Sequence, residues 1–374
     1  MKAEQLIEKE SKTKIINSRI AKRESNIELL RIICMIGIIA HHCVVHGGSI
    51  NMEYCTNKVI SILLLPAGKI GFTCFLAIST WYLVDSEFKT IRFIKMWLEV
   101  FFYSVLFSII AFVVTDTFTI KSFFSALLPI AGNSHGYASS YLLLYLLIPF
   151  LRKITKNITR FQARMLLVIL FYAQILSQII GYINGYYQSI YSEILLFVFC
   201  YFLSLNLKRW PIKIIYDKVI CGLLFASIWL MISHIFYSQV RGNSRGLFEF
   251  ISAITKDESS ILYLLAGYAL FFFFKNISIK HNTIINTIAT TTFGILLIHD
   301  HNFFRGIVWN NIFKCSNWYY SNHFFLKILL CVCNIFIMCG CIDYLRQICF
   351  EKPLFSNKRL IEKCRRMDEK IHEK

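Results

Sequence analysis

Several residues that could do chemistry lie in one apolar stretch near the start of the chain. Residues 27–46 are mostly aliphatic, yet they contain Glu28, Arg31, His41 and His42. Ionisable side chains are costly in such surroundings, so each is a candidate functional residue. A guanidinium presents a planar fork of donors that suits phosphate, and a neutral imidazole can accept the proton of a hydroxyl group.

The spacing of these residues fits one face of a helix. Eleven residues separate Arg31 from His42, which on an α-helix is about 20° around the axis and about 16 Å along it. The face would carry a guanidinium at one end and an imidazole at the other. Glu28 is three residues before Arg31 and can pair with it; a plain snorkelling anchor is the alternative for this pair. His41 points about 100° away from His42.

A second polar cluster lies late in the chain and contains His299 and Asp300. If one helix begins near residue 287, His299 lies about 18 Å along it, and His42 lies about 22 Å from residue 27, so the two imidazoles could meet. Asp300 would either orient an imidazole or cap the helix. A polar contact between helices is the alternative for the histidines. His42 and His46 could bind a metal, but this helix offers no third ligand, so no metal is expected.

The composition excludes most soluble classes. Of 374 residues, 56% are hydrophobic and only 17% are charged, far from the average of a soluble domain. The net charge of +18 is spread over short stretches between long apolar runs, which is typical of membrane proteins and gives no nucleic-acid-binding patch. Thirteen cysteines without a CxxC pair indicate neither a disulfide framework nor a zinc ribbon.

The apolar runs predict an all-α integral membrane protein, a polytopic bundle of about ten helices. Pro66 predicts a broken or kinked second span, and the segment from Phe123 to Ile130 could be interfacial or re-entrant. Residues 1–26 and 347–374 are basic segments that flank a membrane domain at 27–346. The predicted spans are 27–46, 59–84, 96–115, 137–151, 165–184, 191–206, 219–238, 259–274, 287–305 and 324–345.

Lysine and arginine give these spans an orientation. If the N-terminus is cytoplasmic, the inside segments hold 30 of these residues and the outside segments hold 5. This bias predicts an even number of spans with both termini in the cytoplasm. The basic N-terminal segment has no apolar core and no cleavage site, unlike a signal peptide. No internal repeat is visible, which counts against transporters built from inverted repeats.

Several stretches together resemble acyltransferase family 3, integral membrane proteins that O-acetylate bacterial surface polysaccharides and related glycans. The segment from Asn26 to Arg31, followed after ten intervening residues by His42, is similar to the opening motif of that family. Three more motifs agree in order along the chain. They are Gly71-Phe-Thr-Cys-Phe-Leu-Ala-Ile-Ser79 with Tyr82-Leu83, Tyr141-Leu-Leu-Leu-Tyr-Leu-Leu-Ile-Pro149, and Phe293-Gly-Ile-Leu-Leu-Ile-His299.

The cytoplasmic Arg-x-x-Arg of the family has a counterpart in Arg92-Phe-Ile-Lys95, in which Lys95 replaces the second arginine. That change keeps the charge and loses the bidentate fork. A second departure is Thr80 after Ser79, where the family usually has glycine, so helix packing there can differ.

The resemblance implies a bacterial cytoplasmic-membrane enzyme that moves an acetyl group from cytoplasmic acetyl-CoA to a hydroxyl of a surface polysaccharide or lipid-linked glycan precursor. Arg31 and His42 would be the essential pair, with His299 assisting. Arg31, Arg92 and Lys95 would hold the donor's phosphates. His42 would act as general base or as carrier of a transient acyl group, and Glu28 and Asp300 would support the site. A polysaccharide flippase or small-molecule transporter with a polar midplane pathway is the alternative function.

Overall fold

The computed structural model describes residues 23–114, 124, 126–128, 136–176, 179–180, 193–242, 250–251, 255 and 260–372, and within these ranges the regular structure is entirely helical. Five helical stretches are long and apolar enough to cross a membrane. They are α2 (Ser25–His46), α3 (Thr56–Leu83), α4 (Thr90–Val114), α10 (Lys218–Val240) and Phe324–Phe355, which includes α16 (Phe324–Arg346). The prediction of an all-α membrane protein is confirmed, and ten as the number of spans stays a prediction.

The other helices are shorter, and each predicted span overlaps at least one of the helices described. The segment from Phe123 to Ile130 lies largely outside the described residues, as does the end of the span predicted at 165–184. The shorter helices are α6 (Gly136–Thr155), α7 (Arg160–Phe171), α9 (Glu193–Arg209), α12 (Ile261–Lys275), α13 (Thr283–Ala289), α14 (Thr292–His299), α15 (Asn302–Gly306), α17 (Lys352–Phe355) and α18 (Lys358–His372).

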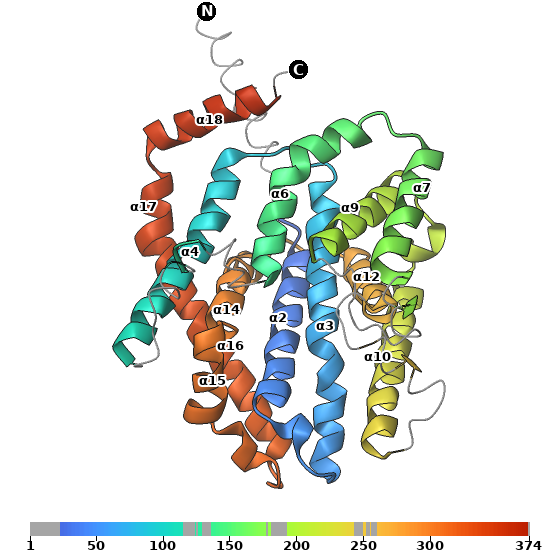
Figure 1. The fold of residues 1–374 in the computed structure, drawn as a ribbon, viewed down its shortest axis with the longest axis vertical. Coiled ribbons are helices and arrows are strands. Elements are labelled where there is room, and N and C mark those ends of the chain that lie inside the picture. Colours follow the sequence, from blue (N-terminus) through green and yellow to red (C-terminus); the bar gives the residue numbers. More distant parts are fainter. Residues whose placement is uncertain are drawn as a thin grey trace, which may run out of the picture.

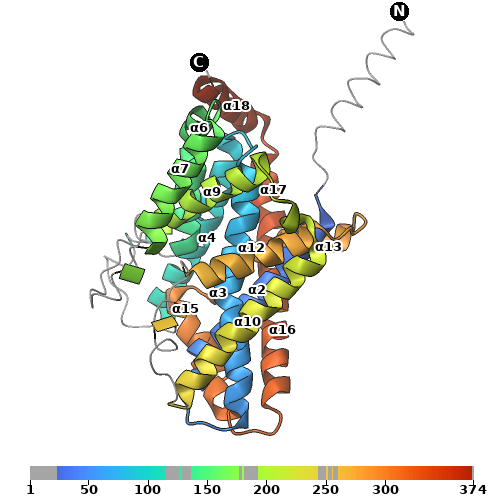
Figure 2. The ribbon, with the colours of Figure 1, turned by 90° about the vertical axis from the view of Figure 1, so that its right-hand side faces the viewer.

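Helices α2 and α3 form the centre of the bundle and lie side by side (Figures 1 and 2). Small residues allow this close approach. A Cβ atom at Gly71 would lie 2.9 Å from the Ile38 side chain and 3.0 Å from the Cys34 carbonyl oxygen. Pro66 lies inside α3, which nevertheless runs without interruption from Thr56 to Leu83. The second span is therefore not broken, and a kink at Pro66 stays a prediction.

The span predicted at 287–305 is not one helix. It is divided into α13, α14 and α15, with breaks at Thr290–Thr291 and at Asp300–His301. At the first break the hydroxyls of Thr290 and Thr291 donate to carbonyls three residues earlier, at 2.7 and 2.8 Å. Such local bonds compete with the regular helix ladder. At the second break His301 is extended, and its Nδ1 accepts from the Phe303 amide at 3.3 Å.

A buried ionic network ties α4 to α16. Arg346 donates from Nε to Asp343 at 2.7 Å, and its Nη2 lies 3.0 Å from Glu99 Oε1. The hydroxyl of Tyr103 donates to Asp343 at 2.8 Å. A Cβ atom at Gly294 would collide with the Asp343 carboxyl, so a glycine is required where α14 crosses this carboxylate. Charges buried in this way need partners, and here the partners fix three helices around the cavity described below.

The C-terminal helix α18 lies at one end of the bundle (Figure 1), where it contacts the start of α4. Asp368 Oδ1 accepts from the amide and the hydroxyl of Thr90, at 2.7 and 2.6 Å. His372 Nε2 lies 3.0 Å from the Phe88 carbonyl oxygen. An acidic side chain at a helix N-terminus satisfies free amides and complements the helix dipole. Asp368 of α18 therefore caps the N-terminus of α4, although it lies far from α4 in the sequence.

Candidate active site

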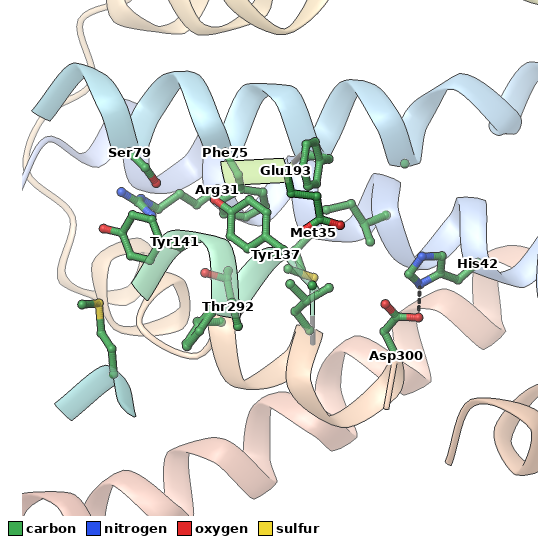
Figure 3. A pocket seen from close by; sticks show the side chains of 18 of the residues that line it. Arg31, Met35, His42, Phe75, Ser79, Tyr137, Tyr141, Glu193, Thr292 and Asp300 are labelled. Carbon is green, nitrogen blue, oxygen red and sulfur yellow. Dashed lines mark ion pairs between the residues drawn. The ribbon is translucent and has the colours of Figure 1, made fainter. Parts of the chain in front are cut away.

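A cavity of about 500 Å³ lies between α2, α3, α4, α6, α9 and α14 (Figure 3). In the close-up, Arg31 lies with Ser79 and Tyr141 at one end, and His42 faces Asp300 at the other. Arg31 and His42 share helix α2, so their separation along its axis is about 16 Å. The predicted polar face of α2 therefore lines a single cavity with both of its functional groups.

The end of the cavity near Arg31 is suited to an anion. Arg31 Nε is buried and has no hydrogen-bond partner among the described residues, and Glu28 Oε2 lies 3.8 Å away. Arg92 lines the same cavity from α4, with its guanidinium carbon 5.6 Å from the centroid of the Tyr145 ring. Two guanidinium groups from separate helices, one with a buried Nε that makes no hydrogen bond among the described residues, fit the phosphates of a nucleotide.

The other end of the cavity contains a directed pair of imidazoles. His299 is completely buried, and its Nδ1 lies 2.6 Å from the Ile295 carbonyl oxygen. A carbonyl only accepts, so Nδ1 of His299 carries the hydrogen and its Nε2 is an acceptor. His42 Nδ1, at 3.1 Å from that Nε2, must then be the donor. This leaves Nε2 of neutral His42 with a free lone pair, as a general base requires.

Asp300 is placed to support the same imidazole. Its Oδ1 lies 3.6 Å from His42 Nδ1 and 3.4 Å from Nη1 of Arg305. A carboxylate at this distance stabilises the imidazolium that forms when His42 takes up a proton. This geometry is compatible with support of an imidazole, and that role of Asp300 stays a prediction.

His41 also lines the cavity, although it lies about 100° around α2 from His42. Its Nδ1 is 2.6 Å from the Leu65 carbonyl oxygen. A Cβ atom at Gly68 would lie 2.3 Å from the His41 ring, so this glycine makes room for the imidazole. Among the described residues His41 makes no ion pair with a carboxylate, whereas His42 lies beside Asp300.

Lys95 is not brought to this cavity. Its Nζ lies 3.4 Å from Glu351 Oε1 and 4.9 Å from the centroid of the Phe355 ring. The Arg-x-x-Lys motif is thus divided, with Arg92 in the cavity and Lys95 in an ion pair with Glu351, which follows α16. The phosphate-binding role predicted for Lys95 has no geometric support here.

The lining includes ionisable residues that the sequence reasoning did not select, namely Lys69, Glu99 and Glu193. All three lie inside apolar runs that were predicted to be spans. The rule that singled out His42, the cost of a charge in a membrane, applies to them equally. Glu193 Oε2 accepts from the Ser140 hydroxyl at 3.0 Å, which places a carboxylate midway along the cavity wall (Figure 3).

One group of donors in the site has the composition of a metal site. Ligand atoms of His42, His46 and Asp300 lie within 4.8 Å of one another, so Asp300 supplies the third ligand that α2 lacks. Arg305 shares that carboxylate, and its positive charge opposes a cation there. The set suits proton transfer better than metal binding.

A helical membrane protein whose cavity has guanidinium groups at one end and an imidazole with a free Nε2 at the other has the parts of an enzyme that transfers a group from a charged donor. Residues 24–344 match the family model acyltransferase 3, described as an acyltransferase domain. The chain therefore belongs to the acyltransferase 3 family, and it is a membrane acyltransferase. No curated protein and no solved structure matches it.

Proposed function

We propose that this acyltransferase moves an acetyl group from acetyl-CoA to a hydroxyl of a surface polysaccharide or of its lipid-linked precursor. One observation carries the proposal: Arg31, with a buried donor free to bind an anion, and His42, with Nε2 free to accept a proton, line one cavity on the same helix. Their separation of about 16 Å along α2 is comparable with the pantetheine arm of coenzyme A.

The donor would bind with its phosphates at Arg31 and Arg92 and its thioester toward His42. Charge-assisted hydrogen bonds from guanidinium groups are among the strongest contacts that a protein offers to phosphate. The acceptor hydroxyl would reach His42 from the other end of the cavity. Both substrates would then meet in a site with little water, where the carboxylate of Asp300 acts more strongly than it would in solvent.

Transfer would proceed by attack of the acceptor oxygen on the carbonyl carbon of the thioester. His42 Nε2 takes the hydroxyl proton as the new C–O bond forms, and His299 holds the ring through Nδ1. The C–S bond then breaks, and the proton passes from His42 to the departing sulfur, giving the acetyl ester and free coenzyme A. In the covalent alternative, His42 Nε2 carries the acetyl group between the two substrates.

The enzyme would lie in the bacterial cytoplasmic membrane with both termini in the cytoplasm. The excess of lysine and arginine in the predicted inside segments supports this orientation. The basic helix α18 and the start of α4, which leads to Arg92, lie together at one end of the bundle. Acetyl-CoA would reach Arg31 and Arg92 from that end.

The test uses purified full-length protein in lipid nanodiscs, acetyl-CoA labelled in the acetyl group, and a glycan extract from a strain that lacks the gene. We expect label in the glycan, with the rate lowered about 100-fold or more in His42→Ala and much less in His41→Ala. Arg31→Lys should raise the donor concentration needed for half-maximal rate, because it keeps the charge and loses the fork.

Quenching the reaction without acceptor separates the two chemical routes, because only the covalent route leaves label on the protein. A protein that transfers no label, but that moves a glycan precursor across vesicles, would instead be the transporter considered above. Loss of activity in His41→Ala with full activity in His42→Ala would contradict the assignment of the base.

A further inference from the structure

We propose that Cys43, Cys315 and Cys331 form a binding site for monovalent copper, apart from the acyl-transfer cavity. Their three sulfur atoms lie within 4.8 Å of one another, and the side chains come from α2, from η5 (Cys315–Trp318) and from α16. All three residues are buried, with exposed fractions of 1 to 3%. Segments almost 300 residues apart in the sequence thus bring three soft ligands to one point.

The spacing of the sulfur atoms fits a trigonal metal. A metal–thiolate bond of about 2.3 Å places the sulfurs of a planar three-ligand site about 4.0 Å apart. The Sγ atoms of Cys43 and Cys315 are 4.0 Å apart. In the reduced protein the Cys43 thiol donates an S–H···S hydrogen bond to Cys315 at this distance, and a disulfide would need about 2.05 Å. Loss of the shared proton would leave the two sulfur atoms at the spacing of a planar three-ligand site.

The choice of metal follows from the number and softness of the ligands. Thiolates select Cu(I), zinc and iron–sulfur clusters. Structural zinc takes four ligands, and the described part of the chain adds no fourth His, Cys, Asp or Glu to this group. Cu(I) is satisfied by three sulfur ligands. Each thiol that ionises on binding releases its proton to water, and no electron is transferred.

A glycine makes the approach of the ligands possible. Gly47 follows α2 directly, and a Cβ atom there would lie 2.7 Å from the Cβ of Cys315 and 2.1 Å from the carbonyl oxygen of Cys43. Any side chain at this position would push η5 away from α2. The absence of a side chain at Gly47 therefore allows Cys315 to lie next to Cys43.

The three cysteines lie next to the acyl-transfer cavity in the fold but do not line it. Cys43 directly follows His42 in α2, and none of the three cysteines lines the cavity. A bound ion would join the end of α2 to η5 and α16, fixing the helix that carries His42. Binding itself does not depend on the proposed acetyl transfer.

The test is an anaerobic titration of the full-length protein, reduced and purified in detergent, with Cu(I) in competition with a chromogenic Cu(I) chelator. We expect one tightly bound equivalent, and X-ray absorption at the copper edge should show three sulfur neighbours. Cys315→Ser and Cys331→Ser should each weaken binding at least 100-fold. Cys333→Ser and Cys341→Ser are matched controls on α16, because both side chains are exposed, and they should bind as the parent does.

Three results would overturn the site. The first is copper binding that is unchanged in both the Cys315→Ser and Cys331→Ser variants. The second is a copper coordination shell that contains nitrogen or fewer than three sulfur atoms. The third is a disulfide between Cys43 and Cys315, found by mass spectrometry in the protein isolated without reductant. Since serine could disturb folding, each variant is first compared with the parent by size-exclusion profile. If the serine variants do not fold, Cys331→Ala replaces them: a variant that elutes normally and binds no copper supports the site. Loss of acetyl transfer with copper binding intact would reject only the proposed function.

Discussion

His299 offers a sharp test of the site, because its partners define what its removal should cost. His299→Leu removes the acceptor that lies 3.1 Å from His42 Nδ1. The Ile295 carbonyl, to which His299 Nδ1 donates, keeps its place in the helix ladder. A net hydrogen bond contributes about 0.5–1.5 kcal/mol, so the rate of acetyl transfer should fall about 2- to 13-fold.

The loss of rate in His299→Leu should be small because a second hydrogen-bond acceptor lies close to His42 Nδ1. Asp300 Oδ1 lies 3.6 Å from the same Nδ1 and can take over after a small rotation. In the double variant His299→Leu/Asp300→Ala, Nδ1 of His42 loses both partners, and the hydrogen can move to Nε2, the atom needed as base. We expect the double variant to lose about 100-fold or more, well beyond the 2- to 13-fold loss of His299→Leu alone.

The assay is the initial rate at saturating acetyl-CoA and glycan acceptor, with donor binding measured separately. His299→Gln is the control, because its amide oxygen can accept from His42 and should restore part of the rate. If His299→Leu alone is as inactive as His42→Ala, His299 itself contacts the reacting atoms. If the double variant keeps its rate, the orientation of His42 through Nδ1 is refuted.

Three further changes test other parts of the structure. Asp368→Ala removes the cap that α18 places on α4. It should raise the KM for acetyl-CoA about 3- to 10-fold with little change in kcat, which corresponds to about 1 kcal/mol for a helix cap. Glu369→Ala, at an exposed neighbouring residue, should change neither KM nor kcat. Gly267→Ala puts a Cβ atom 2.3 Å from Thr73 Oγ1 and should destabilise the protein by about 1–3 kcal/mol, seen as a lower Tm in detergent; an unchanged Tm would show that α12 can move away freely. Reporter fusions in the segment 47–55, between α2 and α3, should read outside and those at the C-terminus inside. A reversed reading at either point would contradict the predicted orientation.

The sequence by itself determined the class of protein and the relative position of the proposed pair, Arg31 and His42. Apolar runs of sufficient length dictate membrane helices, because a backbone in lipid must satisfy its own hydrogen bonds. Arg31 and His42 were placed on one face because both lie in a single regular helix, where spacing fixes direction. Glu28 follows for the same reason, since a separation of three residues is a contact within one helix.

The tertiary structure alone decided what surrounds that pair. The contact of His299 with His42 joins residues 257 positions apart. The sequence placed the two imidazoles at a similar depth, and the packing of α14 against α2 brings them into contact. The division of Arg92 from Lys95 likewise depends on Glu351, which no local pattern connects to them. The sequence sets distances along one helix, but the distance between two helices follows from packing, here from glycines at their crossings and from the pairing of buried charges.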